Sequence, residues 1–119
     1  MMDIHEERIL KKVCDRLSAE RIDSSIVYLD RNLKRVSQSL HVGDVVIEMP
    51  WDGYIAFVDL EPGVNWGHLC SYLAIPLDDN EVIEYAAQMP PFLKTETSSF
   101  HLLWRGIRAP EWAVVITPT

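Results

Sequence analysis

At the centre of the chain stands 54-YIAFVDL-60, a run that is apolar everywhere except at Asp59. Its aromatic and β-branched side chains favour a strand, and an Asp-Gly pair before it and a Pro-Gly pair after it are typical turn signals. Residues Tyr54–Val58 are apolar at successive positions, and successive side chains of a strand point to opposite faces of the sheet. We therefore expect a central strand that is covered on both faces.

On either side of this run the residue pattern has the period of two that strands show, with turn signals every eight to twelve residues. This spacing predicts about eight strands, and the short connections favour antiparallel neighbours. The predicted strands are Ser25–Leu29, Lys34–Leu40, Asp44–Met49, Tyr54–Leu60, Leu69–Pro76, Glu81–Ala87, Ser99–Arg105 and Trp112–Thr117.

The predicted strands differ in how much cover they need. Val82–Ala87 is apolar on both faces apart from Glu84, which predicts a second strand covered on both sides. Lys34–Leu40 alternates between polar and apolar residues and is expected at an edge. Since one helix covers only part of one face, a second β layer or a partner subunit must cover the rest. A homodimer is therefore one expectation.

A helix is expected at the N-terminal end of the chain. Asp3 and Glu6 have the spacing of a capping box, and five apolar residues recur at helical spacing: Ile9, Leu10, Val13, Cys14 and Leu17. The sequence thus predicts a mostly β, α+β fold in a single domain, residues 1–119. An amphipathic helix, at about 3–20, is followed by about eight antiparallel strands, at about 25–117, in a sandwich or a strongly bent meander sheet.

Composition excludes several functional classes. Eleven Lys and Arg face eighteen Asp and Glu, a formal net charge of −7, which argues against nucleic acid and against an anionic membrane surface as partners. No apolar run approaches the ~18 residues that span a bilayer. Cys14 and Cys70 do not form a disulfide framework, and no secretory signal precedes them, so we expect a cytoplasmic protein.

One segment is unusual enough to carry chemistry: Glu61-Pro62-Gly63-Val64-Asn65-Trp66-Gly67-His68-Leu69-Cys70. His68 and Cys70 are two residues apart in a predicted strand and would point to the same face. A thiol hydrolase or transferase would use Cys70 as nucleophile, His68 as base and Asn65 as the orienting group. Against this, thiol nucleophiles usually lie at a helix N-terminus, whereas Cys70 is expected within a strand.

Two other interpretations of this segment are a metal site and a structural turn. His68 and Cys70, with His41 or His101, could ligate a metal, but structural zinc normally needs two close ligand pairs and only one is present, so we expect neither metal nor cofactor. In the structural interpretation Trp66 plugs the end of the β layers and Asn65 bonds the turn backbone. Cys70 is then a small buried apolar residue and His68 donates to a loop carbonyl. We favour this interpretation.

The favoured function is accordingly that of an interaction or binding module rather than an enzyme. Trp51 lies in a predicted hairpin connection, and a proline-rich loop follows the strand that ends at Ala87. If they gather at one end, five residues would form an aromatic, proline-edged patch: Trp51, Trp66, Pro90, Pro91 and Phe92. The N-terminal helix face is the other candidate surface, and the expected partner is another protein or a second copy of the chain.

Overall fold

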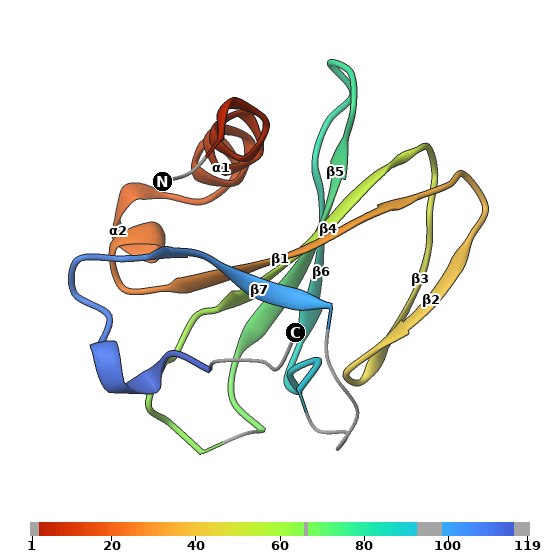
Figure 1. Cartoon of the computed structure of the whole chain (residues 1–119). Helices are drawn as coiled ribbons and strands as arrows, with labels where there is room; N and C mark the ends of the chain where they lie inside the picture. Colours follow the sequence, from red (N-terminus) through yellow and green to blue (C-terminus); the bar gives the residue numbers. More distant parts are fainter. Residues whose placement is uncertain (1–2, 66, 93–98, 116–119) are drawn as a thin grey trace.

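The computed structural model describes residues 3–65, 67–92 and 99–115 (Figure 1). Two helices open it, α1 (Ile4–Arg16) and α2 (Ala19–Asp23). Within these ranges there follow seven strands and a short 3-10 helix: β1 (Ile26–Lys34), β2 (Ser39–Val42), β3 (Val45–Glu48), β4 (Gly53–Asp59), β5 (Cys70–Pro76), β6 (Ile83–Ala87), β7 (Phe100–Arg105) and η1 (Glu111–Ala113). The prediction of a mostly β, antiparallel α+β fold behind an N-terminal helix is confirmed.

Five strands form one antiparallel sheet in the order β6-β5-β4-β1-β7. The apolar run that includes β4 lies in the middle of this sheet, between β1 and β5. The register places Asp59, the last residue of β4, opposite Cys70, the first residue of β5. β4 is buried at every position but Tyr54, as expected for a strand that is covered on both faces.

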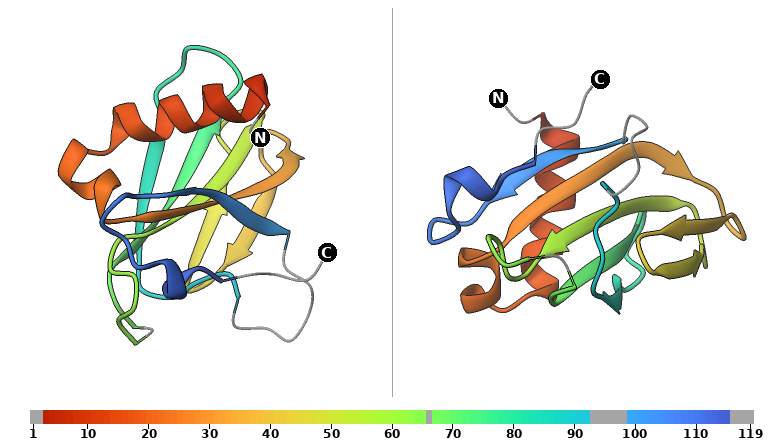
Figure 2. Two further views of the ribbon diagram at one scale, coloured as in Figure 1. Left: turned by 60° about the vertical axis from the view of Figure 1, so that its left-hand side comes forward. Right: turned by 90° about the horizontal axis from the view of Figure 1, so that it is seen from below.

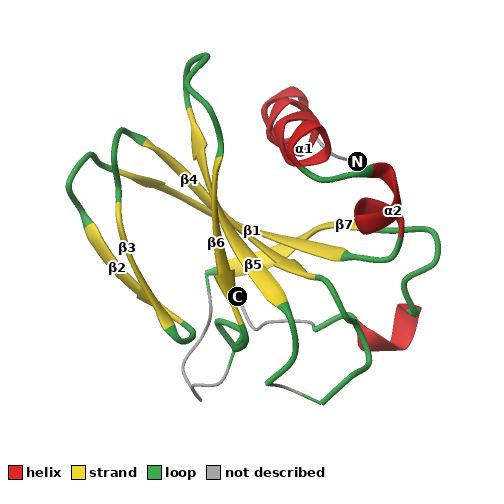
Figure 3. Cartoon of the chain, turned by 180° about the vertical axis from the view of Figure 1, so that it is seen from behind, coloured by secondary structure: helices red, strands yellow, loops and turns green. Residues whose placement is uncertain are grey.

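Each face of the sheet has its own cover. On one face α1 packs its apolar stripe against alternate residues of β4 and β5: Ile9, Val13 and Leu17 meet Ala56, Val58, Leu73 and Ile75. On the other face the hairpin of β2 and β3, through Ile47 and Met49, packs with Tyr28, Phe57 and Tyr72. Figures 2 and 3 show the sheet with α1 on one side and the hairpin on the other. The cover that we expected from a second layer or a partner subunit is thus supplied within the chain.

The β2–β3 hairpin reaches this position because the chain bends at residues 35–38, between β1 and β2. Ser37 has a positive φ of 66° there, and its N–H donates to the Met49 carbonyl at 2.7 Å. At the tip, the Asp44 carboxylate accepts hydrogen bonds from the N–H groups of Gln88 and Met89, just after β6. The tip is therefore fastened to the far edge of the sheet.

Glycine is required at this tip. Gly43 has a φ of +55°, and a Cβ on it would lie 2.5 Å from the Tyr72 hydroxyl. That hydroxyl donates to the Met89 carbonyl at 2.9 Å. A side chain at position 43 would push the hairpin off the face that it covers.

Two helices replace the single predicted helix at 3–20. Asp3 caps α1 as predicted, accepting from the Glu6 N–H. Leu17 is extended, however, and the Ser18 side chain accepts from the Arg21 N–H to begin α2. Serine caps a new helix more readily than it continues an old one, because its hydroxyl bonds the free backbone donors.

Three of the strand predictions were wrong. Lys34–Leu40 is not one edge strand, because β1 ends at Lys34 and the chain bends before β2. Val82–Ala87 is not covered on both sides: β6 is an edge strand that pairs with β5, and Ile83 and Ala86 are exposed. In Trp112–Thr117 the described part is η1 and a non-strand segment, while Ile116 and Thr117 lie outside the described residues.

Both cysteines are free, Cys14 half-buried and Cys70 buried. Within the described ranges, neither helix has the length and apolar character required to cross a bilayer.

Candidate functional site

The most distinctive polar group in the fold is the carboxyl of Asp59. The alternation of β4 places Ile55, Phe57 and Asp59 on the face that the hairpin covers. Asp59 ends the strand at the edge of that core and is only 3% exposed. A buried carboxyl needs partners, because the loss of hydration costs several kcal/mol otherwise.

Its main partner is His68, which the β4–β5 loop (residues 60–69) carries back to the strand. His68 Nε2 lies 2.7 Å from Asp59 Oδ1, and Nδ1 lies 3.0 Å from the Asn65 carbonyl oxygen. Because a carbonyl only accepts, Nδ1 must carry a hydrogen. Nε2 then either donates to an ionised Asp59 or accepts from a protonated one, and in both states the pair has no net charge.

The loop is held to this pair by two further hydrogen bonds. Asp59 Oδ1 also accepts from the Glu61 N–H at 3.2 Å, and Glu61 Oε1 accepts from the Leu69 N–H at 2.8 Å. Burial raises the pKa of Asp59, and the hydrogen bond and charge of His68 offset this effect only in part.

A cavity of about 270 Å³ opens beside the pair, between the loop and the C-terminal segment (residues 112–115). Figures 1 and 3 show these two segments side by side at one end of the sheet. We call this cavity the Asp59 pocket; it is lined by Asp59, Gly63, Val64, Asn65, Trp112, Ala113 and Val115. The hydrogen bonds that the described residues give to Asp59 all reach Oδ1, so Oδ2 is the oxygen left for a ligand.

The outer wall of the Asp59 pocket is apolar. Trp112 is 76% exposed and lies over Gly63, where a Cβ would come within 2.7 Å of the indole ring. Val64 beside it is also exposed. The Tyr28 hydroxyl accepts from the Val115 N–H at 2.9 Å and so ties the C-terminal segment to the core.

Cys70 is not in the state that a nucleophile needs. It is fully buried in the core below the hairpin, and its thiol is directed to the Met89 carbonyl, 3.8 Å away. Burial, with smaller contributions from the charges of Asp44 and Asp59, raises its pKa to about 12. The hydrogen bonds of His68 described above go to Asp59 and to the Asn65 carbonyl rather than to this thiol.

The described members of the predicted aromatic patch are buried or half-buried. Trp51 packs half-buried against the core, and Pro90 is buried. Phe92 lies 4.8 Å from Tyr28 between ring centroids and belongs to the core. Pro91 is half-buried beside it, and Trp66 lies outside the described residues. Among the described residues of the β4–β5 loop and the C-terminal segment, the exposed large apolar side chains are Val64, Leu69 and Trp112.

The ligands considered for a metal are also dispersed. His41 is on β2 of the hairpin and His101 is on β7. His68 and Asp59 meet, but in the part of the chain that the structure describes no three His, Cys, Asp or Glu residues are placed to hold a metal ion.

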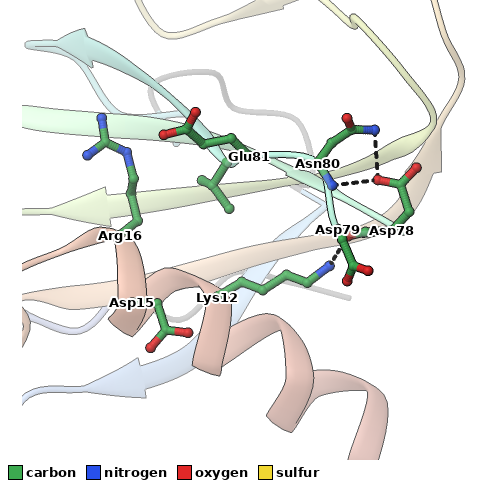
Figure 4. A pocket seen from close by; sticks show the side chains of 8 residues that line it. Lys12, Asp15, Arg16, Asp78, Asp79, Asn80 and Glu81 are labelled. Atoms are coloured by element: carbon green, nitrogen blue, oxygen red, sulfur yellow. Dashed lines mark hydrogen bonds between the residues drawn. The ribbon is translucent and has the colours of Figure 1, made fainter.

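A second hollow lies between α1 and the β5–β6 loop (Figure 4). It involves the N-terminal helix, whose face was the other candidate surface in the sequence. It consists of two adjoining cavities of about 320 and 480 Å³. Lys12 spans it, donating to the carbonyls of Pro76 and Asp78 at 2.7 and 2.9 Å. Basic residues of α1 face acidic residues of the loop across it, so it favours no one sign of ligand: Arg8, Lys11 and Arg16 face Asp78, Asp79 and Glu81.

Neither Asp59 nor Trp112 was assigned to a site from the sequence. The position of Asp59, as the one polar residue in the central apolar run, could have indicated a functional role. Its pairing with His68 could not be predicted, because it depends on the path of the loop. Scans against protein-family models and searches of curated proteins and of solved structures found no match to this chain.

Proposed function

We propose that this chain is a small binding module, not an enzyme, and that it recognises its partner through the Asp59 pocket and the apolar rim formed by Val64 and Trp112. The observation that carries the proposal is the combination, in one cavity, of Asp59, which is only 3% exposed, with Trp112, which is 76% exposed. A buried polar group in a hollow that apolar side chains also line is typical of recognition sites, where a few polar atoms fix the orientation of a ligand.

The contacts of the site favour binding over catalysis. His68 holds the loop through both ring nitrogens, and Cys70 is buried with a raised pKa. A hydrolase centred on Cys70, His68 and Asn65 would need a thiolate beside an available base. That alternative has less support than the binding module.

The partner we propose is another protein in the cytoplasm. Trp is among the residues that contribute most to protein interfaces, and large apolar side chains at the surface mark such contacts. A second copy of the chain has less support as the partner, because the β2–β3 hairpin already covers the face that led us to consider a homodimer. The helix face has less support too, since the apolar stripe of α1 is used in packing against the sheet.

Two matched valines allow a direct test. Val64 on the rim is 54% exposed, and Val36, in the bend that follows β1, is 56% exposed. We would tag wild-type protein, Val64→Ser, Trp112→Ala and Val36→Ser, and quantify by mass spectrometry the proteins that each retains from an extract of the source cells. Circular dichroism would verify folding.

We expect one defined partner to be lost at least about tenfold with Val64→Ser and with Trp112→Ala, corresponding to about 1.4 kcal/mol. Val36→Ser should retain it at the wild-type level. If all three variants retain the same proteins as the wild type, or if Val36→Ser loses the partner too, the proposed surface is wrong.

A further inference from the structure

The charges around the Asp59 pocket select its ligand. Among the described residues that line it, Asp59 is the one ionisable side chain, and none is Lys, Arg or His. Glu61 stands close enough for its charge to act on Asp59, and the whole chain carries a net charge of −7. An anionic ligand would find no positively charged side chain among these described lining residues, so a cationic or neutral ligand is favoured.

The proton arrangement of the pair adds a second restriction. Whether Asp59 is ionised or shares its proton with His68 through Oδ1, Oδ2 has a lone pair to offer and no hydrogen. A ligand group that meets Oδ2 must therefore be a hydrogen-bond donor. A carbonyl, carboxylate or phosphate would be repelled.

The hydrogen bonds that Asp59 Oδ1 already makes favour an ammonium ligand over a guanidinium ligand. Guanidinium binds a carboxylate best through two parallel hydrogen bonds that use both oxygens. In Asp59, Oδ1 is already hydrogen-bonded to His68 and accepts from the Glu61 N–H. A single free oxygen suits the compact ammonium group better than the planar fork of guanidinium.

The remaining walls suit an alkyl chain that ends in such a group. Val64, Ala113 and Val115 supply apolar contact, and the Trp112 indole lies on the same cavity. Aromatic faces attract cations, and tryptophan does so most strongly. A volume of about 270 Å³ is slightly below the range of sites for drug-sized molecules, so one short chain fills it.

We propose that the Asp59 pocket binds a primary ammonium group on a short alkyl chain, with Asp59 Oδ2 as the acceptor and the Trp112 indole as a wall. This inference rests on the proposed function, since it names the chemistry that the same surface recognises. The ammonium can come from a free alkylamine or from a lysine side chain of a protein.

Nuclear magnetic resonance titrations with four probes test the proposal. The probes are pentylamine, Nα-acetyl-lysine methylamide, its uncharged analogue Nα-acetyl-norleucine methylamide, and Nα-acetyl-arginine methylamide. The readouts are the backbone amides of Val64 and Val115 and the indole N–H of Trp112. We expect both amines to shift these signals, and the norleucine and arginine probes to bind at least about tenfold more weakly.

The two sources give different results. Affinities of pentylamine and the blocked lysine that agree within about threefold assign the site to alkylamines in general. Binding of the blocked lysine at least about tenfold tighter assigns it to a lysine of a protein partner. Both results support the ammonium site, whereas equal binding of the norleucine probe overturns it.

Two variants complete the test. Asp59→Asn places a donor amide in the carboxyl position and should abolish amine binding. Trp112→Leu keeps apolar bulk at an exposed position, removes the aromatic face and should weaken both amines at least about threefold. If Asp59→Asn does not fold, Trp112→Leu decides, and unchanged amine affinity in a folded variant overturns the proposal.

Failure of the amines to bind while Val64→Ser still loses a protein partner refutes this inference alone. Amine binding without any Val64-dependent partner refutes the proposed function instead.

Discussion

The carboxyl groups of Glu84 and Asp59 lie on opposite faces of the sheet, and they are partnered in different ways. Glu84, on β6, faces the helices: Arg21 lies 2.7 Å and Arg16 3.6 Å from its two oxygens, and the Ser71 hydroxyl donates to it at 2.6 Å. Asp59, on β4, faces the hairpin side, and its partners reach one oxygen.

The pKa values of the two groups move in opposite directions. Burial would raise the pKa of Glu84, but the hydrogen bonds from Arg21 and Ser71 and the charges of Arg21 and Arg16 outweigh it, so the pKa is lowered. The pKa of Asp59 is raised, because burial outweighs the contribution of His68. A carboxyl with both oxygens bonded to the protein is a structural fastener, and one with an oxygen left over beside a cavity is a candidate for recognition.

The largest effect that we predict comes from removing the Asp59 carboxyl. Asp59→Ala deprives buried His68 and the Glu61 N–H of their shared hydrogen-bond partner, and should lower the free energy of unfolding by about 3 kcal/mol. Urea unfolding measures this. Asp79→Ala, which removes an exposed carboxyl of the β5–β6 loop, is the control and should leave the midpoint unchanged. Equal midpoints for the two variants would show that the Asp59–His68 pair does not stabilise the fold.

Glu84→Gln should cost less, about 1 kcal/mol, because Arg16 and Arg21 are partly exposed and can return to water while the amide oxygen still accepts from Ser71. Its pH dependence should also oppose that of Asp59. The lowered pKa of Glu84 gives stability that is present above about 4.5, its usual pKa, and is lost as the pH falls. The difference between wild type and Glu84→Gln should therefore shrink on acidification.

The stability that Asp59 contributes depends on pH in the opposite direction. Its raised pKa means that the folded state binds the proton more tightly than the unfolded chain, so the stability it contributes is lost as the pH rises above about 3.8. The difference between wild type and Asp59→Asn should shrink from about pH 3 toward pH 7. Urea unfolding of both variants across this range gives the two slopes, and slopes of the same sign would contradict the comparison.

The smallest expected effect concerns Cys70, which lies opposite Asp59 in the β4–β5 register. With its pKa raised to about 12, the buried thiol should give no iodoacetamide adduct in the folded protein between about pH 5 and pH 9. Mass spectrometry locates any adduct, and both cysteines of the urea-unfolded protein should react. Rapid alkylation of Cys70 below about pH 7 would favour the thiol hydrolase over the binding module.

Local patterns were enough to predict part of this architecture. The stripe of Ile9, Val13 and Leu17 predicted a helix, and the unbroken apolar character of 54–58 predicted a strand covered on both faces; the structure has both. These features depend on neighbours in the sequence, which is why periodicity reveals them. The bend at residues 35–38 was missed, since Ser37 is neither Gly nor Asn and gives little sign of a positive φ.

The candidate site was harder to predict, because its members come together through tertiary contacts. The alternation of Trp112, Val114 and Ile116 resembles a strand, but in the structure Trp112 is in η1 and lies over Gly63 at the surface. Phe92 follows two prolines, a pattern that favours an exposed loop, yet it packs against Tyr28 and Phe57. In both cases tertiary contacts, rather than local propensity, decide the outcome.

The length of the β2–β3 hairpin, whose strands have four residues each, is related to the width of the sheet. It starts at the β1–β4 ribbon and ends where Asp44 reaches the backbone just past β6, so its length matches the distance to that edge. Two residues more or fewer in each arm would move the tip by about 7 Å and break this match. A homologous chain with an added strand beyond β6 would need a hairpin longer by about 4.8 Å, the spacing of neighbouring strands. The width of the sheet and the length of the hairpin should therefore change together in evolution and in design.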